Sequence, residues 1–495
     1  MNKILNYDLV IIGAGFIGSM IAKKLSEYNI NTAIIEKRDA PGCAVTKAGL
    51  SALHSPDFCP KGSLKEKFCI NAFNKFKMLS EELGVKFKEF DEIRLAFSDE
   101  DLSRLKKYKE QGESLGLDIY EILDQEILRK EEPFITDEAI AALKIKNLGS
   151  IYPPEWCFAL LETALKNGVS VYLNTEVVSI KKESSSLFQY LINTNNVTIA
   201  TKTILNCAGL FANEIAAMLG DNYINIEYEK ATMAILDKSA SYITKNMIYG
   251  SFSFDHSQVI APTAHGNLII GLGYFIKTMD REDVGVARGK IDEILNMAKR
   301  LIPGIAAKDI ITSFSGIKSE NTLTTPKKDF YIDYSKSSPG VIHVVIGSPG
   351  LTAAPEISNY VINMIDRSCI KLIKKNEIEK KRDIFIKYAE LNKEEISVQI
   401  KENPQFARII CRCEKITEAE IVEAIKRGAV TLDAIKHYTR AGMGRCQGGF
   451  CGPAILNIIS RELKCPIETI VKNDKDSFLI KGHSKKKKEV LDEKY

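Results

Sequence analysis

The first forty residues alternate apolar runs with short polar breaks, in an order that predicts strand, turn, helix and strand. An apolar run over 7–12 leads into the glycine-rich stretch 13–18, and residues 19–28 carry apolar side chains at helical spacing. A second apolar run over 32–35 closes on Glu36. This order is typical of a dinucleotide-binding unit, because it places the start of a helix at the end of a buried strand.

Three glycines shape the predicted turn. Gly13 permits a tight bend, Gly15 lets backbone N–H groups approach a pyrophosphate, and Gly18 lets the helix pack on the strand. The start of the helix attracts phosphate, and Glu36 is placed to accept hydrogen bonds from a ribose. The motif predicts dinucleotide binding, but by itself it does not separate FAD from NAD.

The same pattern of strand, glycine turn and helix recurs twice further along the chain. Apolar runs over 203–207 and 341–346 each end in a glycine turn, and a helix is predicted after both. Strand ends that converge in this way fit one large ligand. Further elements are predicted as hairpins over 190–203 and 258–271, and as helices over 66–82, 101–115 and 352–365.

The composition changes beyond residue 370. Residues 371–403 are rich in lysine, glutamate and isoleucine and contain no glycine, which predicts a charged helical connector. The alternative is that these residues form part of the surface of the preceding domain. A compact segment over 406–465 follows, and the lysine-rich tail over 466–495 is expected to be solvated and flexible.

Length and charge exclude several classes of protein. A chain of 495 residues that is 45% hydrophobic is large enough for two or three globular domains. Its 68 basic and 64 acidic side chains are too balanced to favour a nucleic-acid partner. We expect no direct membrane span and no signal peptide. Eleven cysteines, an odd number unevenly spread, predict reduced thiols in a cytoplasm and not a disulfide framework.

Four of the cysteines have the spacing of metal ligands. Cys411 and Cys413 form a C-x-C pair, and Cys446 and Cys451 form a glycine-rich C-x-x-x-x-C pair. A capping box at 417–420 predicts the start of the first of two helices between the pairs, so the pairs can converge on one site. The alternatives are a [2Fe–2S] cluster, a zinc ion and unliganded thiols. Zinc sites usually use C-x-x-C pairs, so the observed spacing favours the iron–sulfur cluster.

These motifs are similar to two known families. Residues 1–370 resemble FAD-dependent oxidoreductases of the D-amino-acid oxidase type, which include glycerol-3-phosphate and 2-hydroxyglutarate dehydrogenases. Residues 406–455 resemble the small [2Fe–2S] domain of the bacterioferritin-associated ferredoxin type, on Cys411-Arg412-Cys413-Glu414 and on the stretch 439–448. The two domains in this order resemble the large subunits of anaerobic glycerol-3-phosphate dehydrogenases. The Gly-Ser-Pro-Gly-Leu-Thr stretch at 347–352 is closer to the 2-hydroxyglutarate branch.

The resemblance implies an α/β fold with a Rossmann-type FAD-binding domain, an α+β substrate domain and a small, mainly helical [2Fe–2S] domain. The expected boundaries are 1–75, 150–215 and 335–370 for the FAD-binding domain, 76–149 and 216–334 for the substrate domain, 371–405 for the connector, 406–465 for the [2Fe–2S] domain and 466–495 for the tail. The residues that it implies for FAD are Gly13, Gly15, Phe16, Ile17, Gly18, Glu36, Thr46, Val177, Ala208, Gly209, Gly347, Gly350, Leu351 and Thr352.

The reaction expected from this resemblance is oxidation of the secondary alcohol of a small anionic substrate, first of all glycerol 3-phosphate, by hydride transfer to flavin. Electrons would leave through the cluster toward a second redox subunit or electron carrier. His54 is the expected base, because its loop should pass the flavin; the alternative is a histidine that only hydrogen-bonds FAD or the loop. Lys318, where the family often has arginine, is the expected anchor for the anion; the alternative is a surface lysine.

Other assignments remain open at this point. The substrate could instead be L-2-hydroxyglutarate, another 2-hydroxy acid, an amino acid or an opine. In a different class, the chain could be a redox-sensing or assembly subunit of a larger complex. Of the other histidines, we expect His265 to be a solvated turn residue and His343, inside an apolar strand, to be a hydrogen-bonded core residue.

Overall fold

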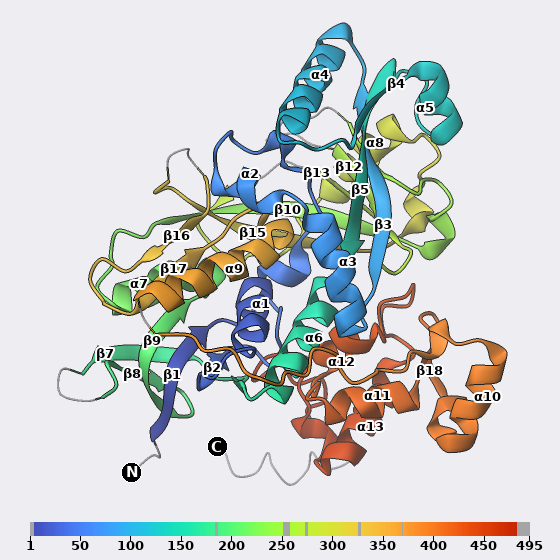
Figure 1. Ribbon diagram of the computed structural model, residues 1–495. Helices are drawn as coiled ribbons and strands as arrows, with labels where there is room; N and C mark the ends of the chain where they lie inside the picture. Colours follow the sequence, from blue (N-terminus) through green and yellow to red (C-terminus); the bar gives the residue numbers. More distant parts are fainter. Residues whose placement is uncertain are drawn as a thin grey trace, which may run out of the picture. The chain divides into compact units, whose positions relative to one another are not determined.

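The structure is a computed structural model that describes residues 4–183, 187–250, 258–272, 276–324, 328–368 and 370–482. Its contacts divide the chain into two compact units. The first unit consists of Met1–Lys37 and Pro41–Arg382, and the second consists of Arg38–Ala40 and Asp383–Tyr495. Two sheets with their helices form the first unit, and the second is mainly helical (Figure 1).

The first sheet has eight strands and a parallel centre. Its strands, in spatial order, are β16 (Tyr331–Tyr334), β17 (Val341–Val345), β9 (Thr198–Asn206), β1 (Ile4–Ile12), β2 (Thr32–Ile35) and β6 (Ser170–Tyr172), and β8 (Tyr190–Thr194) joins β7 (Val177–Lys182) to β9. β1 runs parallel to β2 and β9, and β17 runs parallel to β9. The glycine turns that follow β1, β9 and β17 therefore lie at one edge of the sheet.

Helices cover one face of this sheet. α1 (Phe16–Leu25) packs against α6 (Pro153–Lys166) and α9 (Gly350–Ser368), as Figure 1 shows. Leu9 and Ile11 of β1 belong to the core under these helices, whereas Val10 and Ile12 belong to the core on the opposite face, with β7, β8 and α7 (Ala212–Met218). Burial on both faces explains the continuous apolar run of the first strand.

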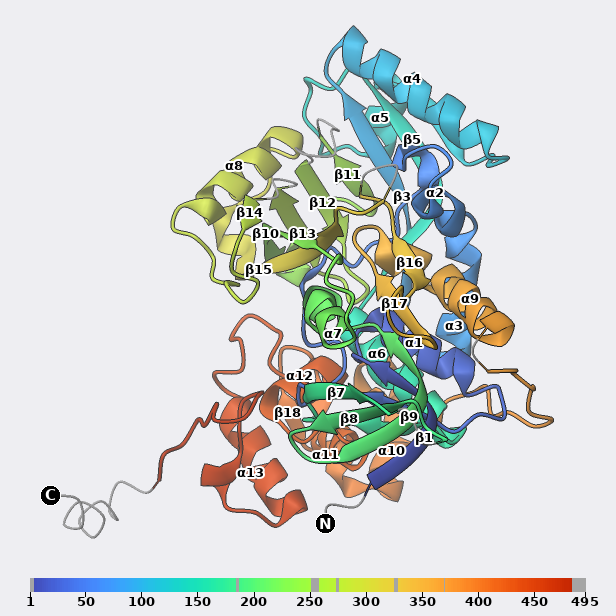
Figure 2. The same cartoon turned by 90° about the vertical axis from the view of Figure 1, so that its left-hand side faces the viewer.

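The second sheet has nine strands and is largely antiparallel. Its strands, in spatial order, are β14 (Ile276–Thr278), β10 (Ile226–Leu236), β13 (Leu268–Leu272), β12 (Gln258–Pro262), β11 (Met247–Tyr249), β3 (Phe87–Ala96), β5 (Ala141–Ile151) and β4 (Tyr120–Asp124), and β15 (Ile310–Asn321) also pairs with β10. In β3, Ile93 and Leu95 join the core under α8 (Lys290–Leu301), so Glu92 and Arg94 take the other face of the strand. Figure 2 shows α8 and the sheet side by side.

Shorter elements complete the first unit. They are η1 (Val45–Ala48), η2 (Pro56–Phe58), α2 (Leu64–Cys69), α3 (Ala72–Leu83), α4 (Asp99–Ser114), α5 (Gln125–Glu131), η3 (Gly209–Phe211), η4 (Lys238–Ala240) and η5 (Ala307–Asp309). α2 and α3 replace the single helix expected over 66–82, because Asn71 takes a left-handed conformation with a φ of 59° and breaks the helix. In the part of the chain that the structure describes, no helix is long and apolar enough to cross a membrane.

The second unit holds the four clustered cysteines. Its elements are η6 (Tyr388–Glu390), α10 (Lys393–Glu402), η7 (Pro404–Ala407), β18 (Ile409–Cys411), β19 (Ile416–Thr417), α11 (Glu418–Lys426), α12 (Leu432–Thr439), α13 (Gly452–Leu463) and η8 (Ile467–Thr469). The predicted capping box is present, because Thr417 and Glu420 exchange side-chain and backbone hydrogen bonds at the start of α11. The last residues of the expected tail, 483–495, lie outside the described residues.

The expected helical connector is wrong over most of its length. Only α10 is an α-helix within 371–403. Lys374 forms an isolated β-bridge with Tyr28, and the Arg382 guanidinium pairs with Glu162 on α6. These contacts hold the segment in an extended form, so tertiary packing overrides its helical composition. The fold class itself is confirmed, while the expected domain boundaries remain predictions.

Candidate cofactor and substrate site

The first glycine turn leaves no room for a side chain at two positions. Gly13 has a φ of +104°, which glycine adopts without strain, and a Cβ there would lie 2.5 Å from the carbonyl oxygen of Cys207. A Cβ on Gly18 would lie 2.0 Å from the carbonyl oxygen of Gly13. The turn therefore packs directly against the end of β9, and α1 packs directly against the turn.

The first turn of α1 contains no acidic residue and no side chain that caps the helix from its N-cap position. The N-cap residue is Gly15. The Phe16 N–H donates to Thr46 Oγ1 at 3.1 Å. The Glu36 carboxylate accepts the Ala14 N–H at 2.8 Å, which fixes the acid beside the turn. Because a helix start carries partial positive charge, this arrangement suits a phosphate group.

Two more turns follow β9 and β17 at the same edge of the sheet. After β9, the Ala208 N–H donates to Asn206 Oδ1 at 3.3 Å, and Gly209 has a φ of +56°. After β17, a Cβ on Gly347 would lie 2.8 Å from a carboxylate oxygen of Glu320. Neighbouring atoms therefore pack closely at Gly347, whereas no described atom lies within 4 Å of a Cβ built on Gly209.

α9 joins the third turn to the loop that carries His54. The helix begins at Gly350 with no acidic residue in its first turn. The Oγ1 atom of Thr352 accepts the backbone N–H of His54 at 3.0 Å. Leu351 packs against the apolar cluster that contains Phe16, so the first and third turns converge.

The three turns fit FAD. Two helix starts without acidic side chains suit the pyrophosphate and the polar edge of a flavin, and the glycines allow a cofactor to approach the backbone. FAD would be held by the turns at 13–18, 206–209 and 347–352, with Glu36 at the ribose. Val177 lies in β7, and its place beside the adenine stays a prediction.

His54 lies half-buried at this edge, with its ring edge-on to Phe58 at a centroid distance of 5.5 Å. Burial and the nearby Arg94 guanidinium, opposed by Asp57, lower the pKa of His54 to about 4. The imidazole is therefore neutral at pH 7 and able to accept a proton. The lowered pKa also makes this imidazole a weaker base than an ordinary histidine, and its role as the base stays a prediction.

A buried charge cluster that was not expected from the sequence surrounds Arg94 of β3. The Arg94 side chain is fully buried. Its guanidinium contacts Asp57 Oδ2 and Glu92 Oε1 and donates to Ser55 Oγ at 3.0 Å. The Tyr120 hydroxyl also donates to Asp57, at 3.1 Å. The sequence holds one signal for the cluster, because Glu92 and Arg94 are two charged residues on one face of a strand that is otherwise apolar at its end.

Lys318 of β15 is not the surface lysine of the alternative interpretation, since its side chain is 15% exposed. Its Nζ lies 2.9 Å from Glu229 and 3.1 Å from Glu320. Burial acts to raise the pKa of Glu229, but hydrogen bonds from Lys318 and Lys328 hold it below its usual value. Glu320 also faces Lys65 at 3.7 Å. The role of Lys318 as an anion anchor stays a prediction.

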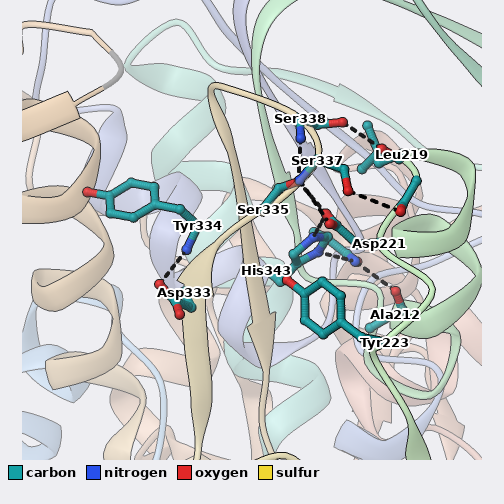
Figure 3. A network of polar contacts seen from close by, with 12 residues as sticks. Ala212, Leu219, Asp221, Tyr223, Asp333, Tyr334, Ser335, Ser337, Ser338 and His343 are labelled. Carbon is teal, nitrogen blue, oxygen red and sulfur yellow. Dashed lines mark hydrogen bonds and ion pairs between the residues drawn. The ribbon is translucent and has the colours of Figure 1, made fainter.

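The expectation for His265 is wrong, and the expectation for His343 is confirmed. His265 is not a solvated turn residue, because its Nε2 lies 3.2 Å from Glu155 and its side chain is 10% exposed. His343 is buried in β17, as expected of a core residue. Its Nε2 lies 2.9 Å from Asp221, and its Nδ1 lies 3.0 Å from the amide nitrogen of Asn206 (Figure 3).

The network in Figure 3 fixes the hydrogen positions on His343. The Asn206 amide nitrogen can only donate, so His343 Nδ1 accepts its hydrogen bond. The ring proton is therefore on Nε2, and this N–H donates to Asp221. Asp221 also accepts hydrogen bonds from the Ser335 hydroxyl and from the Ser337 N–H. The end of β9 is thereby tied to β17 just before both cofactor turns.

We expect His343→Gln to weaken the loss of stability at low pH. Burial, opposed by Asp221, lowers the pKa of His343 in the folded chain. Below about pH 6.5 the unfolded chain therefore binds a proton that the folded chain does not, and the free energy of unfolding falls by up to about 1.4 kcal/mol per pH unit. Glutamine retains an N–H for Asp221 but does not titrate. Urea unfolding midpoints of both proteins at about pH 8 and about pH 5.5 measure how much stability each protein loses as the pH falls. Equal losses in the variant and the wild type would contradict the prediction.

The clustered cysteines form two pairs in the second unit. The thiols of Cys411 and Cys451 are hydrogen-bonded to each other, and so are those of Cys413 and Cys446. A Cβ on Gly444 would lie 2.1 Å from the Cβ of Cys413, so only glycine fits there. Among the described residues, no group of three or more metal-ligating side chains surrounds a single ion position. Two pairs fit the two irons of a [2Fe–2S] cluster better than they fit one zinc ion.

The thiolate is favoured at one cysteine of each pair, because the pKa is lowered at Cys411 and Cys446 and raised at their partners Cys451 and Cys413. The Cys451 thiol and the N–H groups of Gly442 and Glu414 bond to Cys411 and lower its pKa to about 6. Arg440 pairs with Glu414 at 3.0 Å, next to the cluster ligands. The four cysteines would therefore hold a [2Fe–2S] cluster, and donors to the ligating sulfurs would tune it.

Comparisons with known proteins agree with this geometry. Residues 8–364 match the model of the FAD dependent oxidoreductase family, and residues 409–461 match the BFD-like [2Fe-2S] binding domain. FAD and a [2Fe–2S] cluster are therefore the cofactors of this chain, and the zinc alternative is not supported.

Individual relatives agree with the family models. A glycerol 3-phosphate dehydrogenase from Caloramator mitchellensis is 38% identical over 97% of this chain and 99% of its own length. A glycerol 3-phosphate oxidase from Mycoplasma genitalium is 27% identical over 74% of this chain and 96% of its own. The fold is similar to that of the FAD-bound L-alpha-glycerophosphate oxidase from Mycoplasma pneumoniae, with a TM-score of 0.71 and 22% identity over 77% of this chain and 99% of that one. This chain belongs to the family of FAD-dependent oxidoreductases and carries a BFD-like [2Fe–2S] domain after its oxidoreductase domain.

Proposed function

We propose that this chain is a dehydrogenase that oxidises the secondary alcohol of glycerol 3-phosphate to a ketone. The observation that carries the proposal is the similarity to a glycerol 3-phosphate dehydrogenase at 38% identity over 97% of the chain, which includes both the oxidoreductase and the [2Fe–2S] segments. Support for L-2-hydroxyglutarate as the substrate is weaker, since one dehydrogenase named for it is 26% identical over only 43% of this chain.

The reaction removes two hydrogens from the substrate. The carbinol carbon loses its hydrogen as a hydride, the hydroxyl loses a proton, and a ketone remains. When bound, FAD supplies the hydride acceptor and the [2Fe–2S] cluster supplies a carrier of single electrons. His54, neutral at pH 7 and held by the backbone contact to Thr352, takes the hydroxyl proton at an imidazole nitrogen.

The substrate's anionic group needs a cation, and its electrons need an exit. Lys318 takes the first role, with Glu229 and Glu320 fixing the ammonium group in place. A second redox subunit or an electron carrier takes the electrons from this chain. We further propose a cytoplasmic location, because the eleven cysteines of the sequence do not have the pattern of a disulfide framework.

Anaerobic bleaching of the flavin tests the substrate assignment. Glycerol 3-phosphate should bleach the absorbance of purified holoprotein, while L-2-hydroxyglutarate, proline and glycine should bleach it far more slowly at equal concentration. Faster bleaching by a 2-hydroxy acid or an amino acid would overturn the proposed substrate. Absence of bleaching by every alcohol and amino acid would instead favour a redox-sensing subunit.

We expect Lys318→Ala to raise KM with kcat nearly intact. An anchor that grips the anion equally in the ground and transition states contributes to binding and not to the chemical step. Loss of one charge-assisted contact costs about 2–3 kcal/mol. The ratio kcat/KM should then fall about 30- to 150-fold. Steady-state rates with an artificial acceptor measure both parameters.

Lys328→Ala is the matched control for Lys318. Lys328 also pairs with Glu229, at 2.9 Å, but 47% of its side chain is exposed. Both variants remove one cation from the same carboxylate, so a change caused only by Glu229 should appear in both. A KM that stays normal in Lys318→Ala, or rises equally in the two variants, would contradict the anchor role.

A further inference from the structure

The loop that carries His54 is fastened to the second sheet by its backbone. The Leu53 N–H donates to the Gly149 carbonyl at 2.7 Å, and the Ile151 N–H donates to the Ser51 carbonyl at 3.1 Å. Residues 51–53 thus run beside the end of β5. This pairing ends before His54, so the residues that follow must be held by something else.

Side chains hold the second half of the loop. Ser55 and Asp57, directly after His54, are 1% and 0% exposed, and both contact the Arg94 guanidinium. One nitrogen of the fork bonds Asp57 Oδ2 while the other reaches Ser55 Oγ. The Tyr120 hydroxyl of β4 also donates a hydrogen bond to Asp57. A planar fork that reaches two groups at once fixes orientation as well as distance.

Arg94 is itself rigidly placed. In β3 it pairs with Leu143 of β5 on one side and with Tyr249 of β11 on the other, so its backbone is central in the sheet. Its guanidinium carbon lies 5.9 Å from the ring centre of Phe58 and 5.4 Å from that of Tyr108. Because the side chain is fully buried between rings and carboxyl groups, it has few other positions available.

Burial affects the charge of Glu92, the second carboxyl group that contacts Arg94. Burial raises the pKa of Glu92, and among the described residues its Oε2 atom has no hydrogen-bond partner. Burial therefore disfavours the charged form of the Glu92 carboxyl, and the neighbouring Arg94 guanidinium opposes this effect. The charged groups that act on the His54 imidazole are Arg94 of β3 and Asp57 of η2.

We propose that Arg94 is a positioning residue for the proton-accepting step, acting through Ser55 and Asp57 to hold the His54 imidazole against the substrate. The inference rests on the proposed role of His54 as the base. It assigns a function to a buried ion pair that would otherwise be a costly way to stabilise a core, because apolar residues of similar volume often stabilise as well. A displacement of about 1 Å at a reacting group can lower a rate about 100-fold.

Arg94→Lys tests the proposal in the FAD-loaded full chain. Lysine keeps the charge but cannot bond Ser55 and Asp57 with one planar fork. We expect the rate constant of anaerobic flavin reduction by glycerol 3-phosphate to fall about 100-fold, with KM within about threefold of wild type. As a readout besides activity, modification of His54 by diethyl pyrocarbonate, followed by mass spectrometry of its peptide, should change its rate because the imidazole has moved.

Arg382→Lys is the matched control. Arg382 is another buried arginine of the same unit, and its guanidinium pairs with both carboxylate oxygens of Glu162. It should leave flavin reduction and His54 modification unchanged, since Glu162 belongs to α6 and not to the His54 loop. If Arg94→Lys does not fold, Tyr120→Phe removes one bond to Asp57 without leaving a buried charge, and should slow flavin reduction several-fold in the same direction.

The His54→Asn variant separates the proposed base role of His54 from the proposed positioning role of Arg94. If His54→Asn leaves flavin reduction unchanged, the proposed base is wrong and the inference falls with it. If His54→Asn slows reduction but Arg94→Lys does not, the base stands and the positioning role is overturned. In the double variant, Arg94→Lys should add little to the loss, because it acts through an imidazole that is no longer present. Additive losses would show that Arg94 stabilises the fold without positioning the base.

Discussion

Cys411→Ser will remove most of the [2Fe–2S] absorption and leave FAD bound. The Cys411 side chain is 1% exposed and bonds to the thiol of Cys451 and to two backbone N–H groups, an environment that favours a thiolate. A serine hydroxyl does not ionise there near pH 7 and is a poor ligand for iron that prefers sulfur. Iron and acid-labile sulfide content, together with the visible spectrum, measure the loss.

The electronic consequence of that variant is equally specific. Flavin reduction by substrate should stay close to the wild-type rate. On the proposed route, in which electrons leave through the cluster, turnover with the physiological acceptor should fall by at least about tenfold. Cys465→Ser is the control, because Cys465 lies in the same unit but outside both cysteine pairs. Zinc in place of iron after anaerobic purification, or loss of FAD together with the cluster, would contradict the assignment.

The parts of the site that follow from local rules could be predicted from the sequence. Gly13 is required by its own φ of +104°, and Gly18 is required because a Cβ there would collide with the carbonyl oxygen of Gly13. The capping box at Thr417 is set by residues three apart, and it appears as predicted. Motifs whose physical cause lies within one turn of chain keep their meaning in any fold.

The buried ion pairs could not be predicted in the same way. Asp57 and Arg94 are 37 residues apart, and their contact depends on how β3 pairs with β5 and β11. Lys318 shows the same limit, because its partner Glu229 reaches it through the register of β10 with β15. Sheet register is set by the whole hydrophobic pattern, so one charged residue in a strand does not announce its partner.

The second large effect expected is that of His54→Asn on the chemical step. Asparagine retains the backbone N–H that bonds Thr352, so the loop should stay attached to α9 while the proton acceptor is lost. Removal of a general base typically costs about 10²- to 10⁴-fold. The rate constant of anaerobic flavin reduction by glycerol 3-phosphate should fall within that range, with KM little changed, because the base acts mainly as the proton moves.

His265→Asn is a suitable control for that loss. His265 is a second largely buried histidine of the same unit, but its partner is Glu155 at the start of α6. Its replacement should leave the rate of flavin reduction close to wild type. An equal loss in both variants would point to a general effect of removing a buried histidine.

The pH dependence gives the same prediction a second, independent test. Because burial and Arg94 lower the pKa of His54 to about 4, the imidazole stays neutral from pH 8 down to about pH 5 and gains a proton only below that. The wild-type rate constant of flavin reduction should therefore be flat with respect to this group across that range and fall as the pH approaches 4.

In His54→Ala, added imidazole should restore part of the rate. The restored part should fall with pH near the ordinary pKa of free imidazole, since the added base lacks the buried position and the neighbouring Arg94. A profile unchanged by the substitution, or a rate that imidazole leaves untouched, would place the base elsewhere at this edge of the sheet.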